Sequence, residues 1–137
     1  MTRINLVEPH QLTDKHLMAE YRELPRIFTA VLKLQEQGIT PADVNIPDHY
    51  ILGKGHMKFF YNKIGWLLNR YNKLRYELLE RGYQLDNKLY HSVVKSVYRI
   101  ATMWYSDYQP KPEDIYLNMV RLCKRSKIPP VMREFYP

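Results

Sequence analysis

Thr2 is the first residue whose chemistry could matter, because removal of the initiator methionine would leave a free α-amine on it. A small side chain at position two permits that removal. An α-amine has a pKa of about 7.7–8.0, against about 10.4 for lysine, so roughly a tenth of it is neutral and nucleophilic at pH 7. The cationic side chains of Arg3, Arg22 and Arg26 would depress this pKa further. Such an amine can attack the anomeric carbon of a sugar and form an imine, although most chains that begin Met-Thr make no use of it.

A carboxylate and several basic residues follow in the segment from His16 to Arg26. On a helical wheel, one face is apolar and carries Leu17, Tyr21, Leu24 and Phe28. The opposite face is basic and carries Lys15, Arg22 and Arg26. Glu23 lies on the flank, about 60° from Arg26. His16 lies one heptad before Glu23 and shares its flank. Spacing alone favours a solvated face with a weak Glu23–Arg26 surface pair. The alternative is a surface that follows phosphates and carries one acid–base group.

Other catalytic motifs are missing from the sequence. It contains no glycine-rich phosphate loop, no zinc-ligand spacing and no nucleophile elbow. The five histidines do not pair with cysteine at metal-ligand spacing. We therefore expect no metal and no cofactor, so any reaction would depend on ordinary side chains or on the terminus.

Composition limits the classes of protein to consider. The 137 residues fit one domain, and 21 basic against 14 acidic residues give a net charge of +7. That surplus suggests a polyanionic partner such as nucleic acid, but it also fits a basic protein that binds none. The single cysteine, Cys123, excludes an internal disulfide. With no signal-peptide or membrane-spanning segment in view, we expect an intracellular monomer that is neither secreted nor bound to a membrane.

The hydrophobic pattern predicts an all-α fold, a compact single-domain bundle of about three main helices with an extended N-terminal arm and an irregular C-terminal tail. Residues 1–12 form the arm, and Thr13 is the expected N-cap of a helix over 14–37 that bends at Pro25 and ends at Gly38. Residues 40–43 start a short turn of helix. The remaining helices are expected over about 56–81, closed by Gly82, then 88–105 and 113–126, with the tail from residue 128.

Several segments closely resemble the pyrimidine-dimer DNA glycosylases, the phage endonuclease V-like family. The longest matches are residues 1–6 and 16–26, which read MTRINL and HLMAEYRELPR. Shorter matches are Ile51-Leu52-Gly53, Gly55-His56, Phe59-Phe60-Tyr61, Lys63, Arg81-Gly82, Asp107-Tyr108, Pro110, Ile115 and Arg121-Leu122. The resemblance spans nearly the whole chain and is dense only over residues 1–63.

The resemblance implies a single DNA glycosylase/AP-lyase domain over residues 1–137 that acts on double-stranded DNA with damaged bases or abasic sites. It assigns the catalytic roles to the Thr2 amine, which displaces the damaged base and forms the imine, and to the Glu23 carboxylate, which assists β-elimination. It places further residues at the DNA or near the amine: Arg3, His16, Arg22, Arg26, His56, Arg121 and Arg125.

The chain departs from the family at residues 131–136, where Val-Met-Arg-Glu-Phe-Tyr replaces the aromatic-rich tail tied to dimer recognition. This departure bears on the lesion more than on the mechanism. Two alternatives therefore stay open beside a pyrimidine-dimer glycosylase: the same lyase acting on an oxidised or ring-opened purine, and a non-catalytic helical DNA-binding module.

Overall fold

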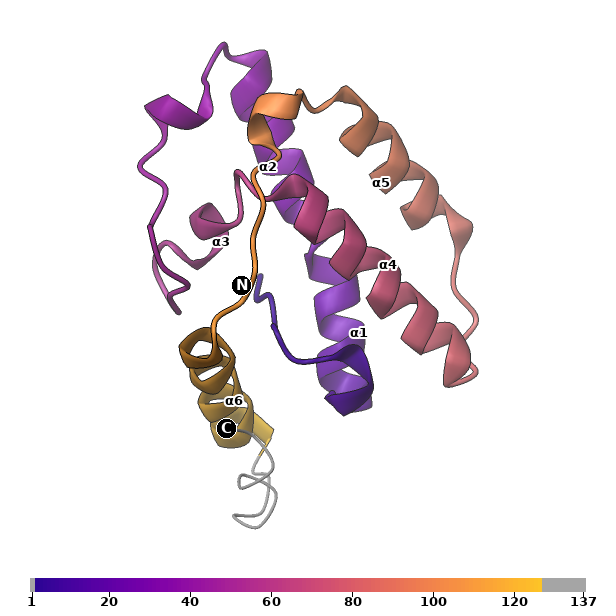
Figure 1. Ribbon diagram of the computed structural model, residues 1–137. Coiled ribbons are helices and arrows are strands. Elements are labelled where there is room, and N and C mark those ends of the chain that lie inside the picture. The colour runs from indigo at the N-terminus through magenta and orange to yellow at the C-terminus, as the bar shows by residue number, and fades with distance from the viewer. Residues whose placement is uncertain (1, 127–137) are drawn as a thin grey trace.

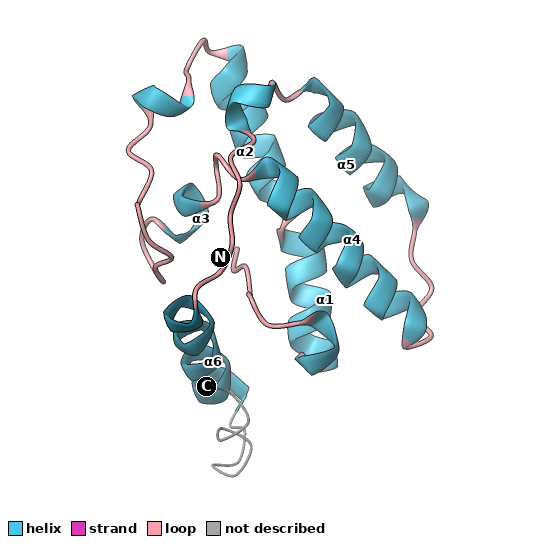
Figure 2. Ribbon diagram, viewed as in Figure 1, coloured by secondary structure: helices cyan, strands magenta, loops and turns pink. Residues whose placement is uncertain are grey.

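The computed structural model describes residues 2–126, and side chains as far as Lys124 (Figure 1). These residues form six α-helices, with short 3₁₀ turns (η) between them: η1 Pro9–Gln11, α1 Asp14–Glu23, α2 Pro25–Glu36, η2 Pro41–Asp43, α3 His56–Phe59, α4 Ile64–Glu80, α5 Asn87–Arg99, η3 Thr102–Trp104 and α6 Pro112–Ser126. Figure 2 shows helices joined by loops over the described residues, which confirms the all-α prediction. The predicted tail from residue 128 lies outside the described residues.

Local signals set the limits of the first long helical segment. The hydroxyl of Thr13 accepts a hydrogen bond from the His16 amide at 3.2 Å, so the predicted N-cap is present. The segment divides at Leu24 because Pro25 has no amide hydrogen with which to continue the helical bonding. It ends at Gly38, whose φ of 78° is the left-handed conformation that glycine adopts without strain.

Two helix limits differ from the sequence-based expectation. The helix expected over 56–81 is divided into α3 and α4, because residues 60–63 turn away and pair with a later segment: the Ser106 amide donates to the Asn62 carbonyl at 2.6 Å, and Lys63 forms an isolated antiparallel bridge with Tyr105. The helix expected over 88–105 ends at Arg99, where the side chain of Gln35 bonds the backbone at Arg99 and Ala101.

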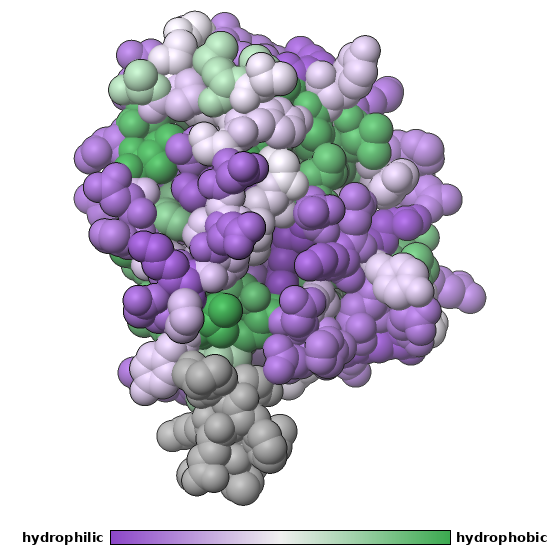
Figure 3. Space-filling view, viewed as in Figure 1, coloured by the Kyte–Doolittle hydropathy of each residue, from purple (hydrophilic) through white to green (hydrophobic). Residues whose placement is uncertain are grey.

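Helices α1 and α2 run one after the other, with α4 packed against α1 and α5 against α2. Helix α6 lies apart from these pairs, beyond the N-terminal arm (Figure 1). One continuous core joins all of these elements, and its largest fully buried side chains include Phe28, Phe60, Tyr71 and Trp104. Hydrophilic residues cover most of the face over α4 (Figure 3).

The arm, residues 2–8, is extended as expected, but it lies inside the molecule rather than on its surface. Ile4, Asn5, Leu6 and Val7 are all buried. None of the helices within residues 2–126 has the length and apolar character that crossing a membrane requires. The fold therefore surrounds the first residues of the chain with helices on several sides.

Candidate active site

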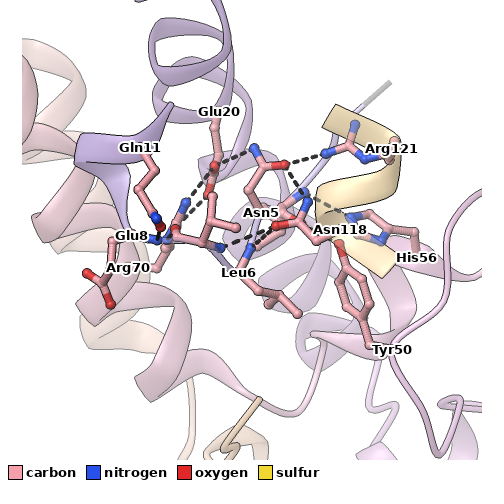
Figure 4. Close-up of polar contacts among 12 residues, drawn as sticks. Asn5, Leu6, Glu8, Gln11, Glu20, Tyr50, His56, Arg70, Asn118 and Arg121 are labelled. Atoms are coloured by element: carbon pink, nitrogen blue, oxygen red, sulfur yellow. Dashed lines mark hydrogen bonds and ion pairs between the residues drawn. The ribbon is translucent and has the colours of Figure 1, made fainter. Parts of the chain in front are cut away.

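A chain of buried polar side chains holds the arm at Asn5 (Figure 4). The Asn5 amide nitrogen Nδ2 donates to Glu20 Oε1 on α1 at 2.8 Å. Its carbonyl oxygen Oδ1 accepts from Asn118 Nδ2 on α6 at 2.8 Å and also from the guanidinium of Arg121. The Asn5 side chain thus connects α1 with α6 through the arm.

The backbone of the arm is bonded by side chains at three consecutive points. Asn118 Oδ1 accepts from the amides of Leu6 and Val7, at 2.6 and 3.2 Å. The Val7 carbonyl accepts from Arg70 Nη1 on α4 at 2.5 Å. Because the arm pairs with no strand among residues 2–126, these side chains satisfy backbone groups that would otherwise be buried without partners.

His56 and Tyr50 bond the backbone of Ile4. The Ile4 amide donates to His56 Nε2 at 2.8 Å, and the Tyr50 hydroxyl donates to the Ile4 carbonyl at 3.0 Å. His56 Nδ1 lies 2.7 Å from the Ile51 carbonyl, so Nδ1 carries the proton and the ring is neutral. Burial lowers the pKa of His56, as do the nearby positive charges of Arg121 and Arg3, which outweighs the bond to Ile51.

The Glu20 carboxylate is fully engaged. Both of its oxygens bond the Arg70 guanidinium, at 2.7 and 3.0 Å, while Oε1 also accepts from Asn5. The side chains of Glu20 and Arg70 are 1% and 4% exposed, so this is a buried bidentate ion pair. Its position ties the arm to α1 and α4 at one place.

Glu23 lies one helical turn beyond Glu20 and is only partly buried. Among the residues that the structure describes, no side chain forms a hydrogen bond or ion pair with its carboxylate. The surface pair with Arg26 that spacing favoured is not formed. The Glu23 carboxylate therefore has no bonding partner among these residues, whereas the nearby Glu20 carboxylate has two, Arg70 and Asn5.

The basic face of this helical segment is as predicted. Lys15, Arg22 and Arg26 are exposed, while Leu17, Tyr21 and Leu24 are buried. Within residues 2–126, neither Arg22 nor Arg26 has an acidic partner, in contrast to Arg70, Arg81 and Arg99, which are all in ion pairs. Two uncompensated guanidinium groups thus lie on the surface next to Glu23 in the sequence.

Thr2 is 2% exposed, and Arg3 is partly exposed. His16 is also partly exposed, on the first turns of α1. Arg125 belongs to α6, but its side chain lies outside the described residues. The predicted roles of these residues stay predictions.

His56 and Arg121, both expected at the DNA interface, are 3% and 7% exposed and bond the arm from within. In this structure their side chains reach the arm and not the surface. A sequence pattern cannot distinguish a basic side chain that contacts DNA from one that contacts buried backbone. Their contact with DNA stays a prediction, and their contact with the arm is a feature that the sequence did not indicate.

The reasoning from sequence missed five residues that bond the arm or one another here: Asn5, Glu20, Tyr50, Arg70 and Asn118. Three of them left a signal, because each lies inside the apolar stripe of its helix. Glu20 is flanked by Leu17 and Leu24, Arg70 by Leu67 and Leu74, and Asn118 by Ile115 and Leu122. A polar residue in a core stripe requires a buried partner, so the three positions predict a buried hydrogen-bond network. They do not predict which residues are bonded to one another.

Residues 2–126 contain no group of three His, Cys, Asp or Glu side chains that could hold a metal ion. What they do contain is a helical domain that encloses its own N-terminal arm and has an available carboxylate near exposed arginines. Exposed arginines without an acidic partner fit a surface that binds a negatively charged molecule.

A family model described as pyrimidine dimer DNA glycosylase matches residues 1–91. The match covers well over half of the 137 residues, so the chain belongs to this family. It includes the arm and helices α1 to α4, and so covers residues 1–63, where the resemblance in sequence is densest. Helix α6, which supplies Asn118 and Arg121, lies outside the matched residues.

Proposed function

We propose that this chain is a DNA-repair glycosylase with AP-lyase activity on ultraviolet-damaged duplex DNA, in which the Thr2 α-amine is the nucleophile and Glu23 assists proton transfer. Membership of the pyrimidine dimer DNA glycosylase family supports the class of reaction and the DNA substrate. The observation that carries the assignment of the acid is the contrast between two glutamates one turn apart: Glu20 is buried in an ion pair, and Glu23 is not engaged.

The path of the arm supports a position of Thr2 near Glu23. Just after the arm, Arg81 bonds the Pro9 and Leu12 carbonyls and also Asp14, the first residue of α1. Further back, Asn5 bonds Glu20. The arm therefore runs antiparallel to α1.

Continuing this direction from Asn5 to Thr2 spans up to about 10 Å of extended chain. The rise along the helix from Glu20 to Glu23 is about 4.5 Å, and Arg26 lies about 4.5 Å further on. The first residues of the arm thus have the length to reach the level of Glu23 and Arg26.

The charge beside Thr2 also suits a nucleophilic amine. The positive charge of Arg3, the next residue, disfavours the charged ammonium form. The reaction requires Met1 to be absent, because an amide nitrogen does not attack a sugar. It also requires Thr2, which is 2% exposed in the chain that keeps Met1, to become accessible to the deoxyribose. A damaged nucleotide drawn out of a kinked duplex would bring that sugar to the arm.

The proposed chemistry uses no group other than the amine and the carboxylate. The amine forms a bond to C1′ as the bond from C1′ to the base breaks, and the base leaves with the electron pair. The added nitrogen loses a proton, and its lone pair then forms the C=N bond as the C1′–O4′ bond breaks; O4′ takes up a proton, so the ring opens and a protonated imine results. Removal of a C2′ proton then breaks the C3′–O bond and expels the 3′ phosphate. Glu23 stabilises the positive charge at the sugar and transfers the protons.

Borohydride trapping tests this proposal, because hydride reduces the imine carbon and leaves a stable covalent bond between protein and DNA. We expect an adduct with abasic duplex and with dimer-bearing duplex, from protein without Met1 and not from protein that keeps it. Replacing Glu23 by Gln should lower turnover at least about a hundredfold with DNA binding nearly unchanged. Glu36→Gln is the matched control, since Glu36 is an exposed carboxylate on α2 that pairs with the exposed Arg99.

The possible outcomes distinguish the alternatives. An adduct with abasic DNA and with duplex containing an oxidised or ring-opened purine, but not with dimer-bearing duplex, would assign the lyase to another lesion. No adduct with any of these DNAs, together with tight binding to them, would indicate a binding module. Full activity of Glu23→Gln would remove Glu23 from the mechanism.

A further inference from the structure

Helix α6 makes close polar contacts with the arm although it lies far away in the sequence. Asn118 is completely buried and uses both atoms of its amide group: Oδ1 accepts from Leu6 and Val7, and Nδ2 donates to Asn5. Asn118 is not among the site residues expected from the sequence. The family match ends at residue 91, so Asn118 belongs to the part of the chain that the match does not explain.

We propose that Asn118 is a positioning residue that fixes the register of the N-terminal arm, so that the Thr2 amine is held at the level of Glu23. This inference rests on the proposed function, because it concerns the same nucleophile. It adds that the nucleophile's position is set by α6 and not only by the helices that surround Glu23.

The arm needs such a device because its register is set by side chains: His56 and Tyr50 bond the backbone of Ile4, and Asn118 bonds the amides of Leu6 and Val7. An extended segment can slip along its neighbours by one residue, which moves every atom by about 3.3 Å and turns each side chain to the opposite face. A strand in a sheet resists slipping through many backbone bonds. The arm lacks those bonds, and side chains must supply the resistance.

The geometry of Asn118 fits only one register. Its single oxygen lies between two consecutive amides, those of Leu6 and Val7, while its nitrogen lies 2.8 Å from the side chain of the preceding residue, Asn5. A slip by one residue would place a hydrophobic side chain opposite Asn118 Nδ2 in place of the Asn5 oxygen. Two buried polar groups would then lose their partners at once.

The orientation of Asn5 is itself fixed. Its oxygen accepts from Asn118 and Arg121, and its nitrogen donates to Glu20, so rotation of the amide by 180° would put donors against donors and an acceptor against an acceptor. Asn5 is therefore held by α6 on one side and by α1 on the other. Thr2 lies only three residues away, and a 1 Å misplacement of a reacting group can cost about a hundredfold in rate.

The test is the single-turnover rate of borohydride-trappable imine formation on abasic duplex, measured with enzyme in excess so that the rate does not depend on the fraction folded. Asn118→Ala should slow this rate roughly ten- to a hundredfold, while the Kd for duplex holding an uncleavable abasic-site analogue changes by less than about twofold. Arg22 and Arg26 are untouched by the change, which is why binding should persist.

Met119→Ala is the matched control. Met119 is the next residue on α6, is 3% exposed and belongs to the hydrophobic core, so its truncation loosens the packing of α6 without removing an amide. We expect it to lower the melting temperature at least as much as Asn118→Ala and to change the trapping rate by less than about threefold. Equal slowing by the two variants would overturn the proposal and leave Asn118 as a packing residue.

Asn5→Ala and the double variant provide a further readout. If Asn5 and Asn118 act as one unit, the double variant should be no slower than the slower single variant, whereas independent effects on the rate would multiply. Multiplying effects would contradict a shared role in register.

Amide hydrogen exchange on the wild-type protein keeps the inference testable if Asn118→Ala fails to fold. In the wild type, the Leu6 and Val7 amides should exchange much more slowly than in an unfolded chain. Exchange at the unfolded rate would refute the proposal that Asn118 holds them. Failure of the two proposals is distinguishable: if the wild type forms no imine, the proposed function fails, and the exchange measurement still reports on the register of the arm.

Discussion

The buried ion pair between Glu20 and Arg70 leads to the sharpest stability prediction. Arg70 Nε lies 2.7 Å from Glu20 Oε2, and Nη2 lies 3.0 Å from Oε1, with both side chains at least 95% buried. The same guanidinium bonds the Val7 carbonyl. Replacing Arg70 by Met keeps much of the side-chain volume but leaves the Glu20 carboxylate in the interior with only Asn5 as a partner.

Breaking a buried pair by removing one partner costs about 3–5 kcal/mol, because the remaining charge is not compensated. For a chain of this size, that loss lowers the melting temperature by roughly 10–20 °C. The control is Arg99→Met. Arg99 and its partner Glu36 are 62% and 54% exposed, and an exposed pair contributes only about 0–1 kcal/mol.

Urea unfolding at pH 7, followed by circular dichroism, measures both variants. The double variant Glu20→Gln/Arg70→Met should recover part of the lost stability, because it removes the charge that Arg70→Met leaves behind. If Arg70→Met costs no more than Arg99→Met, or if the double variant is less stable than Arg70→Met, the reasoning from buried charge is refuted.

Three further predictions concern charge and pH. Burial lowers the pKa of His56, so below about pH 6.5 the unfolded chain takes up a proton that the folded protein does not, and stability should fall as the pH falls. The drop in melting temperature between pH 7 and 5 should therefore be smaller in His56→Gln, whose side chain can still accept a hydrogen bond from the Ile4 amide. Burial lowers the pKa of Lys63 to about 8, so the free energy of unfolding should rise by about 1–2 kcal/mol between pH 7.5 and 9.5 relative to Lys63→Met; a parallel pH dependence of the two proteins would contradict this. Replacing Arg22 or Arg26 by Ala should weaken DNA binding and reduce the slope of log K against log salt by about one unit each, and an unchanged slope would place that arginine away from phosphate.

The sequence predicted the elements whose limits depend on local chemistry. The Thr13 cap, the glycine at the end of α2 and the glycine after α4 each act within a few residues of the helix that they limit. Pro25 divides the first helical segment for an equally local reason. The basic face of this segment follows from the same helical period and is present in the structure.

The limits that the sequence did not predict depend on residues far away along the chain. The helix expected over 56–81 is interrupted at residues 60–63, where the Asn62 carbonyl accepts from Ser106, and α5 stops at Arg99, where Gln35 bonds the backbone. Nothing in a window of ten or fifteen residues contains these contacts. The two short elements that result, α3 and the turn after it, place His56 against the arm, where it accepts from the Ile4 amide. Because the helix limits were predicted wrongly there, this contact was not predicted.

The buried network shows why the fold and the site cannot be separated in this protein. Helices α1, α4 and α6 each place one polar residue in the middle of an apolar stripe: Glu20, Arg70 and Asn118. Glu20 and Arg70 pair with each other, but in a bundle of these helices alone the Arg70 Nη1 group and both amide atoms of Asn118 would lose the partners that they have here, and a buried polar group without a partner costs free energy. The arm supplies the missing partners, through the Asn5 side chain and through the backbone of residues 6 and 7. The segment that leads to Thr2 is therefore a structural part of the core, and a change that frees the arm must also expose the buried polar groups of three helices.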